Sequence, residues 1–390
     1  MPGPKNNHIF FGQFLELLCA EAPTALHQKW MKEHPDALLI RYLTFANAEV
    51  VVLNSANAYK EVLQTHCYSF IKPDAWRRMT RKITGKGILI LEFDEHRTHR
   101  KMLKGAFTSN NIRRLRSDGR TGIINPADTF TKAATDIIFL ATFGIDPGHV
   151  NSTTFSGKVE DGHEYTFHEV YWNIFEQETL GELLMFFDRF IPVQSSSDML
   201  SFILEESMEG GTVEGMTDEY IVGHDKLRQE MRMFEEHCPD PTCTELDALP
   251  YLNNFIKEVL RIYPPAVFIQ RQAAVDILIE GIRIPKGTIV EGPTAPIGMN
   301  PLIWGQDAHE FRPERWEQLT KEQSSPYAFQ AFSSGPRVCI GKQFALHDIK
   351  AVFFEIVRKY RVLGVEGAFT VENPAFALRP SGMKVRLERI

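Results

Sequence analysis

FSSGPRVCIG, residues 332 to 341, places one cysteine, Cys339, inside a frame of two glycines, an arginine and a phenylalanine. The residues around this cysteine are polar and tightly spaced, unlike those around a cysteine that fills a hydrophobic core. Directly behind it, residues 340 to 360 carry apolar side chains at helical spacing, which predicts a long helix. We therefore expect Cys339 to lie just before the N-terminus of that helix.

The frame around Cys339 supplies what a thiolate needs. A helix N-terminus offers unpaired N–H groups and a partial positive charge, which favour the thiolate over the thiol. Gly335 and Gly341 let the backbone fold closely around the sulfur, and Arg337 is a cation suited to a carboxylate. This set favours a ligand of haem iron. The alternative is a nucleophilic cysteine, which needs a general base; His347, two turns along the helix, is expected to point elsewhere.

The stretch resembles the haem-binding signature F-x-x-G-x-R-x-C-x-G of the cytochrome P-450 family, the haem-thiolate monooxygenases. All five fixed positions match, and they are Phe332, Gly335, Arg337, Cys339 and Gly341. The resemblance implies that Cys339 is the axial ligand of the haem iron, that Arg337 holds a haem propionate, and that Phe332 covers the thiolate.

The resemblance also implies a fold, a cofactor and partners. The expected fold is mainly α with small β-sheets, a cytochrome P-450-like fold that is incomplete, with residues 1–390 forming one domain. The cofactor is haem b (iron protoporphyrin IX), and NADPH contributes indirectly through an NADPH-dependent haem-protein reductase. The implied reaction inserts one oxygen atom of O2 into a small apolar substrate. A monomer at the cytosolic face of the endoplasmic reticulum membrane is expected.

Two further motifs agree with this resemblance. In KEVLR, Glu258 and Arg261 are three residues apart and therefore share a helix face, and FRPERW follows with Arg315. A Glu-x-x-Arg pair alone is usually a surface ion pair. In the family, such a pair and a later arginine form a buried charge network under the haem. The resemblance implies that these three residues form this network, whose role is structural.

Three basic residues resemble further contacts to the propionates. Arg271 stands in IQRQA, shortly after the Glu-x-x-Arg helix. In HRTHRKML, His96 and Arg100 are four residues apart. The family carries an aromatic residue or a histidine four residues before an arginine in the corresponding helix. Without the cysteine signature, HRTHRK would be interpreted as an ordinary basic helix face.

Composition excludes several classes of protein. The chain has 390 residues and a formal net charge of −7, which argues against nucleic acid as a partner. No stretch reaches the roughly 20 apolar residues of a membrane span. His237, Cys238 and Cys243 do not make a zinc site, because no second cluster completes four ligands. The odd number of scattered cysteines does not indicate a disulfide framework; they are Cys19, Cys67, Cys238, Cys243 and Cys339.

Periodicity predicts a mostly helical chain that does not alternate as a doubly wound sheet would. Apart from the helix behind Cys339, helical spacing occurs at residues 13–33, 56–66, 94–107, 129–144, 167–190 and 252–265, with a helix start at 195–198 and a loop at 146–166. Strands are expected at residues 37–55, around a turn at Asn47, and at residues 275–292 as a hairpin.

The distal half of the family's haem site is poorly represented. In the family, a long helix across the haem carries an acid and a Thr or Ser that manage protons on dioxygen. Here MTDEYIVGH, residues 216 to 224, resembles the first turns of that helix and runs directly into DKLRQE, which resembles a later helix. At residues 113–126 and 190–200 the chain also passes directly from one segment to a later one, and the helices that the family carries there are absent from the sequence. We therefore expect internal segments and the N-terminal anchor to be missing.

These missing segments leave the activity open. No catalytic residue can be assigned, because the acid–alcohol pair is absent from the sequence. One alternative is a truncated, non-catalytic remnant of the family that binds haem without turnover. Another is a haem-thiolate isomerase or dehydratase, which would not need dioxygen.

Overall fold

The computed structural model describes the chain in several stretches. These are residues 1–78 (except 6 and 21–23), 90–103, 123–124, 157–158, 164–165, 218–366 (except 240), 370–372, 379–381 and 383–390. The helices predicted at residues 129–144 and 167–190, the helix start at 195–198 and the join at 190–200 lie outside the described residues, as does the join at 113–126 apart from residues 123–124.

Three long helices form one part of the fold: α10 (Asp218–Glu235), α12 (Pro250–Ile262) and α15 (Lys342–Lys359). Their apolar faces pack together around a shared core that includes Leu227, Met231, Leu252, Leu260 and Phe354. Burial of such side chains is the main force that holds the helices together. The mainly α fold with small β-sheets that the sequence predicts is confirmed.

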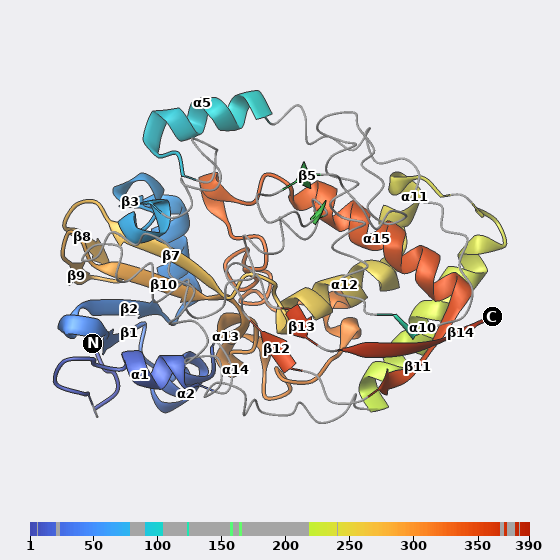
Figure 1. Cartoon of the computed structure of the whole chain (residues 1–390), viewed down its shortest axis with the longest axis horizontal. Helices are drawn as coiled ribbons and strands as arrows, with labels where there is room; N and C mark the ends of the chain where they lie inside the picture. The colour runs from blue at the N-terminus through green and yellow to red at the C-terminus, as the bar shows by residue number, and fades with distance from the viewer. Residues whose placement is uncertain are drawn as a thin grey trace.

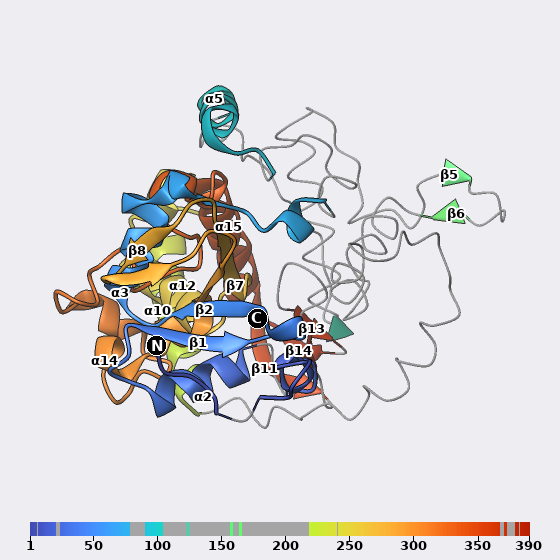
Figure 2. The ribbon, with the colours of Figure 1, turned by 90° about the vertical axis from the view of Figure 1, so that its left-hand side faces the viewer.

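A five-stranded sheet lies beside the helices (Figures 1 and 2). Its strand order is β1-β2-β10-β7-β3, and only β10 and β2 pair in parallel. One face packs on a core that includes Leu39, Val51, Tyr59, Phe70 and Val290. The strands are β1 (Leu39–Leu43), β2 (Glu49–Leu53), β3 (Phe70–Ile71), β7 (Phe268–Ala273) and β10 (Ile289–Pro293).

The remaining described elements are short and connect or flank these two parts. The helices are α1 (Phe14–Leu18), α2 (Ala25–Glu33), α3 (Ala56–Lys60), α5 (Phe93–Leu103), α11 (Cys243–Asp247), α13 (Thr294–Gly298) and α14 (Pro301–Trp304), with single helical turns η1 (Phe45–Asn47), η2 (Glu61–Thr65), η3 (Cys67–Ser69), η5 (Pro313–Glu317) and η6 (Gly335–Arg337). The strands are β4 (Ile123–Ile124), β5 (Gly157–Lys158), β6 (Glu164–Tyr165), β8 (Ile277–Ile279), β9 (Ile282–Ile284), β11 (Tyr360–Glu366), β12 (Thr370–Glu372), β13 (Arg379–Ser381) and β14 (Lys384–Arg389).

Most predicted elements in the described stretches are present, with some boundary corrections. The strand pair turns at Asn47, where φ is 57°. The hairpin predicted within residues 275–292 is confirmed at its Glu-Gly turn, where β8 and β9 pair around Glu280–Gly281, whereas β10 at the end of this stretch joins the large sheet. Residues 13–33 contain two helices rather than one. The predicted loop at 146–166 contains the paired strands β5 and β6.

A buried polar cluster joins α2 to the large sheet. Glu291 on β10 is 6% exposed and accepts hydrogen bonds from His27 Nε2 (3.2 Å), Tyr42 Oη (2.9 Å) and Gln270 Nε2 (2.8 Å). Burial by itself raises the pKa of Glu291. The hydrogen bond and the charge of His27, together with the hydrogen bonds from Tyr42 and Gln270, outweigh this effect and hold the pKa below its ordinary value. The carboxylate is therefore ionised in the folded protein and fixed from three sides.

This cluster predicts an acid-sensitive contribution to stability. Because the folded-state pKa of Glu291 is lowered, its contribution is complete above the unfolded-state pKa of about 4.3 and is lost as the pH falls through the folded-state pKa. We expect Glu291→Gln to lower the free energy of unfolding by about 1.5–3 kcal/mol at pH 6. Urea unfolding from pH 6 to pH 3 should show this difference shrinking, whereas a difference independent of pH would contradict it.

Candidate functional site

The loop that carries Cys339 leads directly into α15. Gly341 is the N-cap residue of that helix, and the backbone N–H of Cys339 donates to the carbonyl of Phe332 at 2.9 Å. The Cys339 side chain is exposed and forms no disulfide. Within the described stretches, no backbone carbonyl accepts the N–H of Ile340 or Gly341. The loop thus presents a thiol at the surface beside amide donors that could stabilise a thiolate.

Gly335 fixes the path of this loop against η2. Its φ is +74°, in the left-handed region, and a Cβ atom there would lie 2.0 Å from the carbonyl oxygen of Leu63. A side chain at this position would therefore meet both backbone strain and a steric clash. This explains physically why the frame around Cys339 carries a glycine here.

We expect Gly335→Ala to lower the free energy of unfolding by at least about 2 kcal/mol, since strain and overpacking act together. Gly281→Ala is a matched control, because Gly281 has a φ of +73° but nothing within 4 Å of its Cβ position. The control should lose only about 1 kcal/mol. Equal losses in urea unfolding would show that contact with Leu63 does not matter.

Arg337 is buried and only partly used. The residue is 8% exposed, and its Nη2 donates to Glu92 Oε2 at 2.5 Å and to the carbonyl of Phe70 at 3.5 Å. Its Nε and Nη1 atoms are buried and have no hydrogen-bond partner. Such donors are costly to leave unsatisfied, so their presence points to an acceptor group at this place.

The same place gathers more positive charge than the described carboxylates balance. Burial lowers the pKa of His96 to about 4, helped by the nearby charges of Arg337, Lys72 and Arg100. Burial lowers the pKa of Lys72 to about 8; Glu92 opposes this shift, and Arg337 and Arg271 add to it. Burial, with the charge of Arg337, lowers the pKa of Arg271 to about 10.

The group of basic side chains around Arg337 is therefore suited to an anionic ligand. Arg271 uses Nη1 for the carbonyl of Gln270 at 2.8 Å, and the buried Nδ1 of His96 has no partner. Among the described residues, Glu92 is the one carboxylate that pairs with this group of cations. A ligand with carboxylates would satisfy the unused donors and the excess charge, as the propionates of haem would.

Two members of this group were not found from the sequence. Lys72 follows β3 in FIKP, and Glu92 precedes α5, four residues before His96. The four-residue spacing to His96 was a usable signal for Glu92, since it suggests one side of a helix. Nothing in the sequence around Lys72 indicates that it pairs with Glu92 or lies near the charge of Arg337.

The network predicted from KEVLR and FRPERW is assembled in the core. Glu258 Oε1 accepts from Arg261 Nη2 (2.8 Å) and from Arg315 Nε (2.9 Å), and Oε2 accepts from Arg261 Nε (2.8 Å). Trp316 Nε1 and the backbone N–H of Arg312 add bonds of 2.9 Å each. The side chains of Glu258, Arg261 and Arg315 are 0–1% exposed.

This network ties α12 to η5 and to two neighbouring turns. Arg261 Nη1 donates to the carbonyls of Gly298 (2.7 Å) and Ala308 (2.5 Å). Burial by itself would raise the pKa of Glu258, but hydrogen bonds and charge from Arg261, with bonds from Arg312 and Arg315, outweigh it and hold the pKa below its ordinary value. The network is thus an ionised, fully bonded cross-link rather than a reactive group.

The remaining sequence candidates take other roles. His347 Nε2 bonds to Asp247 Oδ2 at 3.0 Å, and Lys350 bonds to the other oxygen of the same carboxylate. His347 is thus held by α11 rather than offered as a base. Phe332 is half-buried, and Lys342 Nζ lies 5.9 Å from its ring centre.

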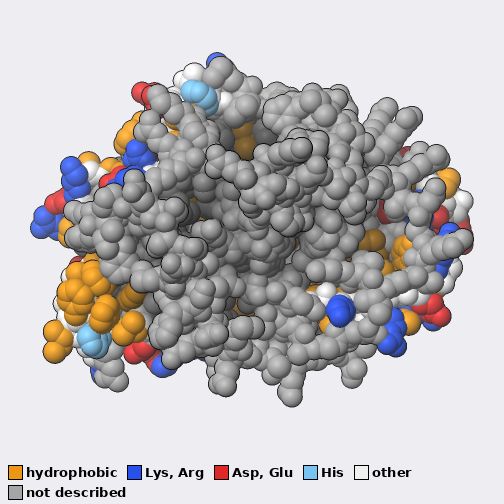
Figure 3. Space-filling view, in the orientation of Figure 1, with side chains coloured by type: hydrophobic (Ala, Val, Ile, Leu, Met, Phe, Trp, Pro, Cys, Tyr) orange, Lys and Arg blue, Asp and Glu red, His pale blue; other side chains and the backbone are white. Residues whose placement is uncertain are grey.

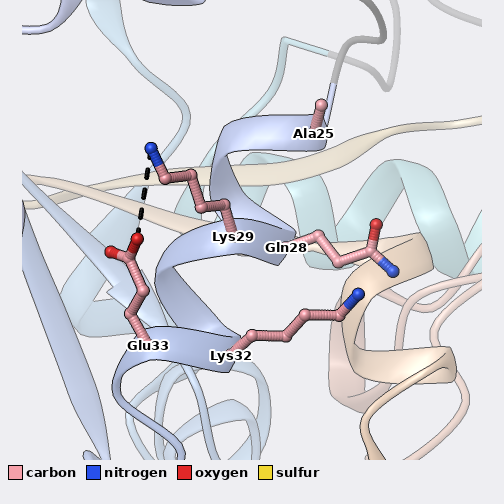
Figure 4. Close-up of a pocket in the computed structure, with 5 residues that line it drawn as sticks. All are labelled: Ala25, Gln28, Lys29, Lys32 and Glu33. Carbon is pink, nitrogen blue, oxygen red and sulfur yellow. Dashed lines mark ion pairs between the residues drawn. The ribbon is translucent and has the colours of Figure 1, made fainter.

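The pocket and the exposed apolar side chains of the described residues lie away from the site around Cys339 and Arg337. A pocket on α2 is formed by one helix face and contains none of the site residues (Figure 4); it is lined by Ala25, Gln28, Lys29, Lys32 and Glu33. Apolar side chains gather at the left of the space-filling view (Figure 3), and the N-terminal segment exposes Ile9, Phe10 and Leu15.

In the described stretches, no helix combines the length and apolar character that crossing a membrane requires, and no cluster of potential metal ligands occurs there.

Comparison with known proteins identifies the family. The family model "Cytochrome P450" matches residues 1–205 and 223–387. "Cytochrome P450 monooxygenase sphH" of Aspergillus fumigatus is 26% identical, over 96% of this chain and 83% of its own length. "Cytochrome P450 monooxygenase FSL4" of Gibberella zeae is 25% identical, over 85% of this chain and 76% of its own. "Cytochrome P450 4e2" of Drosophila melanogaster is 42% identical over 138 residues, which are 35% of this chain and 26% of the relative.

The prediction of missing internal segments agrees with these matches. The alignment with the Aspergillus relative spans 469 positions, more than the 390 residues of this chain, so the relative has residues without a counterpart here. The family match is interrupted at residues 206–222. The stretches MTDEYIVGH and DKLRQE resemble parts of two different helices of the family, but here they lie largely in the single helix α10.

The family match covers most of the chain, and two relatives that match more than nine tenths of it are named monooxygenases. By this resemblance the chain is a haem-dependent monooxygenase, and its described residues have the mainly α architecture with small sheets that the family signature predicted. The protein belongs to the cytochrome P450 family.

Proposed function

We propose that this protein binds haem b through Cys339 and inserts one oxygen atom of O2 into a small apolar substrate, while the other oxygen atom leaves as water. The two electrons come from NADPH through a haem-protein reductase, and the two protons of that water come from the solvent. Residues 1–390 act as one domain in this proposal. Bound haem supplies the activation of dioxygen, which no protein side chain provides.

One observation carries the proposal: the buried Nε and Nη1 atoms of Arg337 have no partner, two residues before an exposed cysteine. A carboxylate-bearing ligand that also needs a thiolate satisfies both groups. Haem is such a ligand, since it combines two propionates with an iron that accepts sulfur. A nucleophilic cysteine would leave the cations around Arg337 unexplained.

The proposal assigns roles to the chain's own residues. Arg337, Arg271 and Arg100 hold the propionates by charge. His96 is neutral at pH 7, since its pKa is about 4, and offers a hydrogen bond from Nδ1. Lys72 adds a further cation at the same place.

The other residues of the signature and the network support the thiolate in this proposal. Gly335 and Gly341 shape the loop, and Phe332 covers the sulfur. Glu258, Arg261 and Arg315 hold the core beneath it.

The partners follow from the chemistry. An apolar substrate suits a haem pocket, because such pockets are mostly hydrophobic. A membrane-bound reductase and an apolar substrate both favour action at the cytosolic face of the endoplasmic reticulum membrane, by a monomer.

A carbon monoxide difference spectrum of the reduced, hemin-loaded chain tests the proposal. We expect a thiolate-type band, together with substrate oxidation that requires NADPH, a reductase and dioxygen. A thiolate band without turnover would instead identify a non-catalytic haem-binding remnant. Turnover that continues without dioxygen would identify an isomerase or dehydratase, and absence of the band would reject haem–thiolate ligation.

A further inference from the structure

Glu92 is a buried carboxylate to which the proposed function gives no role. The residue is 8% exposed, and it contacts two of the cations at the candidate site. Its Oε2 accepts from Arg337 Nη2, whereas its Oε1 accepts the backbone N–H of Lys72 at 2.9 Å and lies 3.7 Å from Lys72 Nζ. A buried carboxylate is stable only when paired and hydrogen-bonded in this way.

These contacts join three segments that are remote in sequence. Lys72 follows β3, Glu92 precedes α5, and Arg337 ends η6. Glu92 lies 20 residues from Lys72 and 245 residues from Arg337 along the chain. One carboxylate therefore sets the relative positions of the segments that carry the basic side chains of the site.

Glu92 also decides how Arg337 presents its unused donors. The guanidinium group is planar and rigid, so fixing one nitrogen fixes the directions of the other two. Glu92 holds Nη2, and the other contact of that atom is the carbonyl of Phe70 at 3.5 Å, at the limit of a hydrogen bond. Nε and Nη1 remain without partners and keep their directions because Nη2 is held.

We propose that Glu92 is a positioning residue for haem: it holds Arg337 so that the free donors of the guanidinium group meet a propionate, and it keeps the charge of Lys72 beside them. Its negative charge also offsets the repulsion between Arg337 and Lys72 while no haem is bound. This inference rests on the proposed function and adds a residue that lies outside the cysteine signature. Glu92 touches neither the iron ligand nor the substrate in this role, and acts through Arg337 and Lys72.

The experiment compares two haems on the full chain. Hemin carries two ionised propionates, whereas hemin dimethyl ester carries the same ring with both charges removed. We expect Glu92→Gln to raise the dissociation constant of hemin about tenfold, as for loss of a charge-assisted hydrogen bond. The dissociation constant of the dimethyl ester should stay within about twofold of the wild-type value, because the ester does not use the charge of the positioned Arg337. Equal weakening for both haems, or none for hemin, would overturn the proposal.

Two further variants complete the test. Glu95→Gln removes an exposed carboxylate three residues away on α5 and should bind both haems as the wild type does. Glu92→Asp keeps the charge but shortens the side chain by one methylene, and it serves if Glu92→Gln does not fold. We expect Glu92→Asp to weaken hemin selectively as well, because position matters; wild-type affinity in this variant would overturn the proposal. Failure of the wild-type chain to give a Cys339-dependent spectrum would instead reject the proposed function itself.

Discussion

Replacing Cys339 by serine is expected to abolish the thiolate-type band of the reduced carbon monoxide complex and to stop NADPH-dependent oxidation. A hydroxyl group stays protonated at neutral pH and does not supply the electron density that a thiolate gives to iron. The side chains that hold the propionates are unchanged, so hemin should still associate and give a different, non-thiolate spectrum. Absorbance spectra of the two hemin-loaded proteins measure this directly.

The matched control is Cys19→Ser. Cys19 is also an exposed, free cysteine, but it lies outside the signature, and its replacement should leave the spectrum unchanged. If Cys339→Ser also left the spectrum unchanged, Cys339 would not be the ligand. Covalent capture of a substrate by Cys339 without any haem would support the nucleophile alternative.

Glu258→Gln is expected to lower the free energy of unfolding by about 3–5 kcal/mol, which is the usual loss when one partner of a buried charge network is removed. The variant leaves Arg261 and Arg315 charged in a place with 0–1% exposure, and the remaining carboxylate contact of the pair is that of Arg315 with Asp307 at 3.4 Å. Because many single domains are stable by only about 5–15 kcal/mol, this loss is large enough to threaten folding. Urea unfolding followed by circular dichroism measures it.

Glu49→Gln provides the comparison for this prediction. Glu49 also pairs with an arginine, Arg41, at 2.7 Å, but both side chains are 43–46% exposed. An exposed ion pair contributes about 1 kcal/mol or less, so this variant should remain close to the wild type. A similar small loss for Glu258→Gln would mean that water reaches the network and that it does not cross-link the core.

Local patterns made much of the candidate site predictable. Gly335 is needed because of its own φ of +74°, and it lies four residues from Cys339 in the same short loop. The pair Glu258–Arg261 follows from one helical turn, and the start of α15 follows from its apolar spacing. Each of these features depends on neighbours in sequence.

The sequence predicted less where an element's partner is remote. Residues 289–292 end the stretch predicted as a hairpin, but they pair with β2 and β7 in the larger sheet. A strand's pattern shows which face is buried and does not name its neighbour. For the same reason the sequence did not indicate Lys72 and Glu92 as site residues, because their roles depend on contacts with residues from other segments.

The sequence by itself determined the family, the cysteine frame and the mainly α class, because these rest on residues whose constraints act within a loop or a few helical turns. Only the tertiary structure decided that Lys72, Glu92, Arg271 and Arg337 meet at one place, where Glu92 and Arg337 are buried and Arg337 donors are left for a ligand. The physical reason is that burial and charge excess depend on which remote segments pack together, and packing brings Glu92 to Arg337 across 245 residues of chain.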